Sequence, residues 1–107
     1  MKSLKFRPYL VQLILDRVKN TTWRLFDDKD IKEGDELLLF NWETLEEFAK
    51  AKVVSVKEKR FNELTEEDWQ GHEKFESKNE MFMEYSKYYK QRIDENTKLK
   101  IIKFRLV

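Results

Sequence analysis

The sequence contains no cysteine, one proline, two glycines and a single histidine, and these scarcities exclude several kinds of site. Without cysteine there is no disulfide, no thiolate nucleophile and no cysteine-based zinc site. With His72 as the only histidine, a histidine-rich metal cluster is impossible. No acidic segment has the spacing of a calcium-binding loop. We therefore expect neither a metal nor any other cofactor.

Long hydrophobic runs are also lacking. No stretch approaches the length of a membrane span, and Met1 is followed at once by charged residues without a signal-peptide core. We expect a cytoplasmic protein with no membrane partner. An excess of one charge is missing too, because 22 Lys and Arg residues balance 21 Asp and Glu residues. A net charge of +1 is unlike the strongly basic character of a domain that binds a wide nucleic-acid surface.

The charges are nevertheless distributed unevenly. Residues 1–24 carry Lys2, Lys5, Arg7, Arg17, Lys19 and Arg24 against Asp16 alone. Residues 62–80 are acidic, with Glu63, Glu66, Glu67, Asp68, Glu73, Glu76 and Glu80 against Lys74 and Lys78. An anionic ligand should therefore approach the amino-terminal quarter of the chain.

The length and the hydrophobic pattern predict an α+β fold. A chain of 107 residues with 40% hydrophobic content supports one core, so we expect a single domain over residues 1–107, present as a monomer. The patterns predict strands over 3–6, 20–26, 36–41, 48–59 and 98–106, with helices over 8–18, from 65 and from 77. Strands joined by short turns, with helices inserted after the first and fourth, favour a mixed, partly closed β-barrel of about five strands.

One short stretch carries candidate chemistry. In a strand, alternate side chains share a face, so Thr22 and Arg24 should point one way, while Thr21 and Trp23 point the other. Lys19 precedes this strand, and its flexible stem should place the ammonium over the Thr22 hydroxyl. On residue types alone the stretch also fits an ordinary strand with solvated ends.

The same stretch resembles the signature of the ASCH family (activating signal cointegrator homology), within the PUA-like superfamily. The family pattern reads roughly L-x-G-x-K-x-x-T-x-R, which Lys19, Thr22 and Arg24 match. Further similarity covers residues 6–9, 33–35, 64–68 and 73–77, so the resemblance extends over essentially the whole chain. It implies a PUA-like barrel. Arg17 departs from the pattern, because it occupies the usual glycine position.

The resemblance also implies a function and site residues. ASCH proteins are associated with RNA binding, and some small bacterial members are similar to amidohydrolases that deacetylate N4-acetylcytidine with a Lys, a Thr and a Glu. Those roles map to Lys19, Thr22 and Glu73, with Glu76 as the alternative carboxylate. Burial and the nearby Arg24 should lower the pKa of Lys19, so that its neutral amine can activate the Thr22 hydroxyl.

Three functions remain open from the sequence. The pocket could bind RNA or a modified nucleoside with help from Arg7 and Arg24, it could hydrolyse acetylated cytidine, or the domain could bind another protein without catalysis. A plain salt bridge between Lys19 and Glu73 is the structural alternative. We expect His72 to be solvated, and the tyrosines of the last helix to pack in the core.

Overall fold

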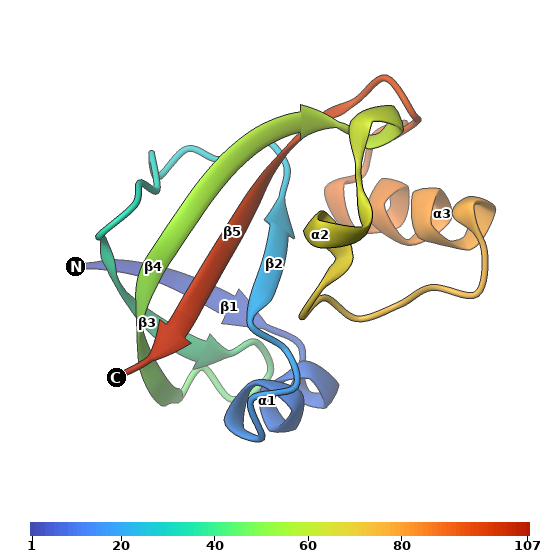
Figure 1. The fold of residues 1–107 in the computed structure, drawn as a ribbon. Coiled ribbons are helices and arrows are strands. Elements are labelled where there is room, and N and C mark those ends of the chain that lie inside the picture. The colour runs from blue at the N-terminus through green and yellow to red at the C-terminus, as the bar shows by residue number, and fades with distance from the viewer.

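The structure is a computed structural model that describes all residues, 1–107 (Figure 1). Its elements are β1 (Lys2–Phe6), α1 (Pro8–Leu15), β2 (Thr21–Arg24), β3 (Glu36–Asn41), β4 (Glu47–Arg60), the 3-10 turn η1 (Phe61–Glu63), α2 (Glu66–Trp69), α3 (Lys78–Tyr89) and β5 (Lys98–Leu106). The predicted order of strands and helices is confirmed. The first helix is shorter than predicted, and β2 covers only the centre of its predicted range.

The five strands form one mixed sheet in the order β1-β3-β4-β5-β2. β1 runs parallel to β3, and the other pairs are antiparallel. The sheet curves into a half-barrel, with α1 at one end and α2 and α3 beside β2 (Figure 1). Across the open side, Arg24 Nη2 on β2 donates to the Lys5 carbonyl on β1 at 2.7 Å. The expected α+β fold with a partly closed barrel is therefore confirmed.

Two hydrophobic clusters lie on the two faces of the sheet, because the strands alternate. The first lies inside the half-barrel and comprises Leu4, Phe6, Leu10, Ile14, Ile31, Leu37, Leu39, Ala51, Val53, Ile102 and Phe104. The second holds α3 and its flanking loops against the outer face, and comprises Trp23, Leu25, Phe61, Met81, Ile93, Leu99 and Ile101. No helix is both long enough and apolar enough to cross a membrane.

The turn between α1 and β2 sets the position of the signature stretch. Arg17 has a φ of 61°, so the residue at the usual glycine position does adopt the left-handed conformation. This costs a non-glycine residue roughly 1 kcal/mol. The turn is closed by the amides of Val18 and Lys19, which both donate to the Leu13 carbonyl, at 2.9 and 3.0 Å. The chain thereby reverses directly in front of β2.

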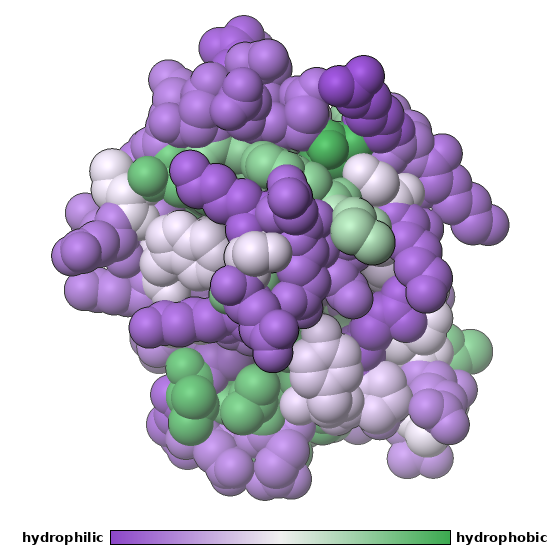
Figure 2. Space-filling model, turned by 90° about the vertical axis from the view of Figure 1, so that its right-hand side faces the viewer, coloured by the Kyte–Doolittle hydropathy of each residue, from purple (hydrophilic) through white to green (hydrophobic).

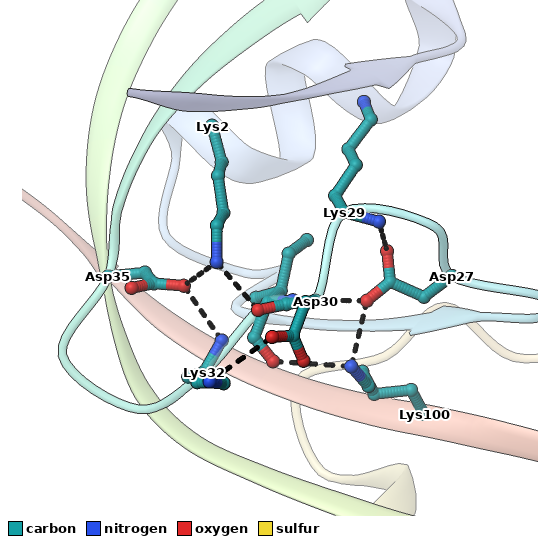
Figure 3. A network of polar contacts seen from close by, with 8 residues as sticks. Lys2, Asp27, Lys29, Asp30, Lys32, Asp35 and Lys100 are labelled. Carbon is teal, nitrogen blue, oxygen red and sulfur yellow. Dashed lines mark hydrogen bonds and ion pairs between the residues drawn. The ribbon is translucent and has the colours of Figure 1, made fainter.

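A polar network fastens the connection between β2 and β3 to the sheet (Figure 3). The nearly buried carboxylate of Asp27 accepts from the amides of Lys29 and Ile31 and from Lys100 Nζ on β5, the last at 2.8 Å. Burial alone would raise the Asp27 pKa, but its ion pair with Lys100 and the two amides hold that pKa below its usual value.

Replacing Asp27 with asparagine is expected to destabilise the fold. Asp27→Asn removes one charge of a pair whose side chains are only 7% and 17% exposed, and it leaves Lys100 uncompensated. The free energy of unfolding should fall by about 2–4 kcal/mol at pH 7. Asp30→Asn is the matched control, because the Asp30–Lys32 pair is 74% and 68% exposed, and it should change stability by less than about 0.5 kcal/mol. Equal effects in urea denaturation would contradict this ranking.

Candidate functional site

A buried ion pair joins the amino-terminal signature to the segment between α2 and α3. Lys19 is 2% exposed, and its Nζ donates to Glu73 Oε1 at 2.5 Å and to the Thr21 carbonyl at 2.7 Å. Glu73 is the carboxylate that meets Lys19, as the resemblance implied. The alternative, Glu76, is exposed, and its backbone amide donates to the side chain of Glu80.

The pKa values of both partners of this pair are shifted from their usual values. Burial lowers the pKa of Lys19 despite the opposing effect of Glu73, and Arg24 lowers it further. Burial would raise the pKa of Glu73, but the Lys19 ammonium outweighs it and holds that pKa below its usual value. Glu73 is therefore ionised, and the Lys19 amine loses its proton more readily than an exposed lysine. No cluster of three or more His, Asp or Glu side chains is placed to hold a metal ion.

A pocket of about 300 Å³ opens beside this pair, between β2, the start of α1 and α3. Its aromatic lining comprises Phe6, Tyr9, Trp23, Trp42, Phe75, Tyr85, Tyr88 and Tyr89, and its polar lining includes Arg7, Thr22, Arg24, His72 and Glu73. Four of the five site residues singled out from the sequence therefore face one pocket. The fifth, Lys19, lies behind Glu73 and lines a smaller neighbouring cavity.

Thr22 and its neighbour Thr21 have separate surroundings. Thr22 pairs with Ile102 of the inner cluster, whereas Trp23 pairs with Ile101 of the outer cluster, so the predicted alternation of faces is present. The Lys19 ammonium, however, hydrogen-bonds to the Thr21 carbonyl and to Glu73 rather than to the Thr22 hydroxyl, which differs from our expectation. The Thr21 hydroxyl donates to the Gln70 carbonyl at 2.7 Å, so Thr21 fastens β2 to the end of α2.

β2 is an edge strand, and one of its pocket-lining residues has its backbone on the unpaired edge. β2 pairs only with β5, so alternate residues of β2 point their amides and carbonyls away from the sheet. On this edge the Thr21 amide donates to the Gly71 carbonyl, and the Leu25 amide donates to Tyr89 Oη. Trp23 lies between them and lines the pocket. Its amide and carbonyl therefore lie on the same free edge of the strand, as one donor and one acceptor.

The two arginines are fixed in different ways. Arg24 donates to the Lys5 carbonyl, and its guanidinium carbon lies 4.8 Å from the Phe6 ring centroid. The Arg7 guanidinium instead stacks against two rings at the pocket mouth. Its carbon lies 5.9 Å from the Trp42 centroid and 5.2 Å from the Tyr88 centroid. Arg24 is thus part of the frame, whereas Arg7 lies on the rim.

His72 is buried, contrary to our expectation that it would be solvated. Its ring stacks on Trp23 with centroids 3.8 Å apart, and its Nδ1 lies 2.7 Å from the Glu73 carbonyl oxygen. Nε2 lies 3.5 Å from Tyr85 Oη. Burial lowers the pKa of His72 to about 4, and the nearby Lys19 lowers it in the same direction. A neutral His72 therefore supports the backbone of the candidate acidic residue.

The aromatic residues of the late segments pack against the outer cluster, and several of them also line the pocket. Only Met81 of α3 is fully buried, whereas Tyr85, Tyr88 and Tyr89 lie on the pocket wall. The prediction that these tyrosines pack in the core was therefore incomplete. A sequence signal did exist, since aromatic rings recur at 69, 72 and 75 and again at 82, 85 and 89. Both series meet around the ring of Trp23.

No protein-family model matches the chain, and no curated protein sequence matches it. Its fold is nevertheless similar to solved structures. The hypothetical protein PH0355 superposes with a TM-score of 0.74 at 22% identity, over 100% of both chains. The ASCH domain from Lactobacillus crispatus JV V101 superposes with a TM-score of 0.67 at 15% identity, covering 90% of this chain and 69% of that one. ASCH from Zymomonas mobilis superposes with a TM-score of 0.69 at 12% identity, covering 96% of this chain and 65% of that one. The chain therefore has the ASCH fold.

The buried histidine is expected to make stability depend on pH. Its pKa is about 4 when folded against 6.5 when unfolded, so on acidification below pH 6.5 the unfolded chain takes up a proton first. The free energy of unfolding therefore has its full value above pH 6.5 and falls by up to roughly 3 kcal/mol as the pH approaches 4. The decline between pH 6.5 and 5 should vanish in His72→Phe, because the chain has no other histidine. An unchanged decline in the variant's denaturation curves would contradict the assignment.

Proposed function

We propose that this chain is an ASCH domain that binds a single nucleoside, free or within RNA, in the pocket beside the Lys19–Glu73 pair. The observation that carries the proposal is the combination of aromatic walls with one oriented carboxylate and one free strand edge in the same cavity. Arg7 and Arg24 are the proposed ligand-binding cations of its wall.

The size and the walls of the pocket favour a nucleobase. A volume of about 300 Å³ is at the small end of ligand pockets, so it suits one nucleoside rather than a run of several. Stacking of one base on an aromatic ring contributes roughly 1–3 kcal/mol. Trp42 and Tyr88 contact each other at the mouth, with centroids 5.5 Å apart, and the face of each ring opposite Arg7 is the one proposed for a base.

The polar groups favour a base that carries an exocyclic amine. An ionised carboxylate is a pure acceptor, and acidic side chains recognise the amino group of cytosine in this way. Glu73 is such an acceptor on the pocket wall. The Trp23 amide and carbonyl add a donor and an acceptor, so a cytosine edge finds complementary partners.

The protein-binding alternative has less support. Figure 2 shows the α3 side of the molecule, where hydrophilic residues cover most of the surface and hydrophobic ones form small separate patches. A stable protein interface would favour a broader apolar area. The balanced net charge of +1 also disfavours a wide RNA surface, which leaves a small-ligand site as the better proposal.

Nucleoside binding is expected to depend on the aromatic mouth. In calorimetric titrations with cytidine and N4-acetylcytidine, Tyr88→Ala should weaken affinity by about tenfold, because it removes a stacking face. Met83→Ala is the matched control on the same helix, since Met83 is 72% exposed and does not line the pocket. If both variants bind equally well, the nucleoside does not occupy this pocket.

A second function, hydrolysis of N4-acetylcytidine, is favoured by one specific observation. Lys19 has a lowered pKa and lies beside the Thr21–Thr22 peptide, and the Thr22 side chain lines the pocket. In this mechanism neutral Lys19 leaves the Thr21 carbonyl and takes the Thr22 hydroxyl proton, and the Thr22 oxygen bonds to the acetyl carbon.

The remaining steps of that mechanism need only Lys19, Thr22 and a water molecule. The bond between the acetyl carbon and the cytosine nitrogen breaks, and that nitrogen receives a proton from Lys19 as cytidine leaves. Water then cleaves the acetyl–threonine ester, releasing acetate and restoring the Thr22 hydroxyl. The Trp23 amide can donate to the oxyanion, and Glu73 orients the Lys19 amine.

The hydrolysis proposal predicts a graded series of variants. Thr22→Ala should abolish cytidine release, Thr22→Ser should retain part of it because the hydroxyl is kept, and Lys19→Arg should be inactive because a guanidinium does not act as a base. The rate should fall as the pH drops through the lowered Lys19 pKa. Chromatographic detection of cytidine measures each rate. A fully active Thr22→Ala would exclude Thr22 as the nucleophile, whereas no cytidine release by the unmodified protein would leave nucleoside binding as the proposed function.

The neighbouring threonine is not a neutral comparison for Thr22. The buried Thr21 hydroxyl donates a hydrogen bond to the Gln70 carbonyl. Thr21→Val should therefore cost about 1–3 kcal/mol of stability, since it leaves that carbonyl unpaired. Thr22→Ser is the better comparison because it changes only a methyl group.

A further inference from the structure

The pocket lining carries more positive than negative charge. Its lining includes the cations Lys5, Arg7, Arg24 and Lys87, and none of these takes part in an ion pair of the chain. Two carboxylates, Glu73 and Glu84, also line it, but Glu73 is already paired with Lys19. The pocket is therefore cationic although the whole chain is nearly neutral.

Among these cations, Arg7 is held by aromatic rings alone, because its side chain has no hydrogen bond or ion pair within the protein. Its guanidinium lies over Trp42 and Tyr88, which come from the turn after β3 and from α3, and Lys5 Nζ lies 5.6 Å from the same Trp42 ring. Stacking holds the plane of a guanidinium through its faces, so the N–H donors along its edge stay available. A planar cation held in this way loses little entropy when it binds an anion.

We propose that the ligand of this pocket is a phosphorylated nucleoside, with the base between the aromatic walls and the phosphate on Arg7 and Lys5. The inference rests on the proposed nucleoside binding and adds the ionic group that the ligand must carry. A guanidinium edge matches two phosphate oxygens, and such charge-assisted pairs are about twice as strong as neutral hydrogen bonds. The phosphate is either the monoester of a mononucleotide or a diester beside the bound residue in RNA.

Titrations with three probes test the phosphate site at low salt. The probes are cytidine, cytidine 5′-monophosphate and the trinucleotide ApCpA. The monophosphate or the trinucleotide should bind about tenfold or more tightly than cytidine. Arg7→Met, which keeps an unbranched apolar stem, should reduce that advantage to less than about twofold, measured against the variant's own cytidine affinity. Arg92→Met is the matched control, because Arg92 is 90% exposed and does not line the pocket, and it should keep the full advantage.

The outcomes separate the phosphate site from nucleoside binding. If cytidine binds and neither phosphorylated probe binds more tightly, the phosphate inference is wrong and the nucleoside pocket stands. An advantage that persists in Arg7→Met also overturns it. If no probe binds, the proposed function fails and the inference fails with it. A tighter monophosphate assigns the site to mononucleotides, whereas a tighter trinucleotide assigns it to the diester of RNA.

Discussion

The arrangement of this protein depends on one buried ion pair between residues 54 positions apart in the chain. Removing a charged amine and a carboxylate from water costs several kcal/mol for each ion, and only close geometry with further hydrogen bonds offsets it. The Lys19 ammonium has both, because it pairs closely with Glu73 and also donates a hydrogen bond to the Thr21 carbonyl. The backbone around the pair is fixed as well, since the amides of Asn20 and Thr21 both donate to the Gly71 carbonyl.

The position of the pair favours function over simple stabilisation. A buried salt bridge stabilises a fold no better than well-packed hydrophobic residues of similar size. Here the Glu73 side chain is 19% exposed and forms part of a pocket wall, while Lys19 is sealed behind it. The Lys19 ammonium keeps the carboxylate ionised at the pocket wall, and burial lowers the pKa of the Lys19 amine.

Local patterns were enough to predict much of the fold. The period of two predicted the strands, and the last one extends over Lys98–Leu106 as expected. The start of α3 was equally readable, because the Ser77 side chain accepts from the amide of Glu80 three residues later. The alternation along β2 correctly separated Thr22 from Trp23. In each case the physical cause acts between near neighbours in the chain, so the sequence alone contains it.

The sequence by itself thus determined the order of the elements, the ASCH resemblance and the residues offered for a site. Only the tertiary structure decided how those residues meet. In the folded protein Glu73 rather than Glu76 pairs with Lys19, the Lys19 ammonium donates to the Thr21 carbonyl, and His72 is buried. The fold also turned the tyrosines of α3 toward a pocket. These outcomes depend on contacts between segments about 50 residues apart, where packing and desolvation rather than local periodicity set the geometry.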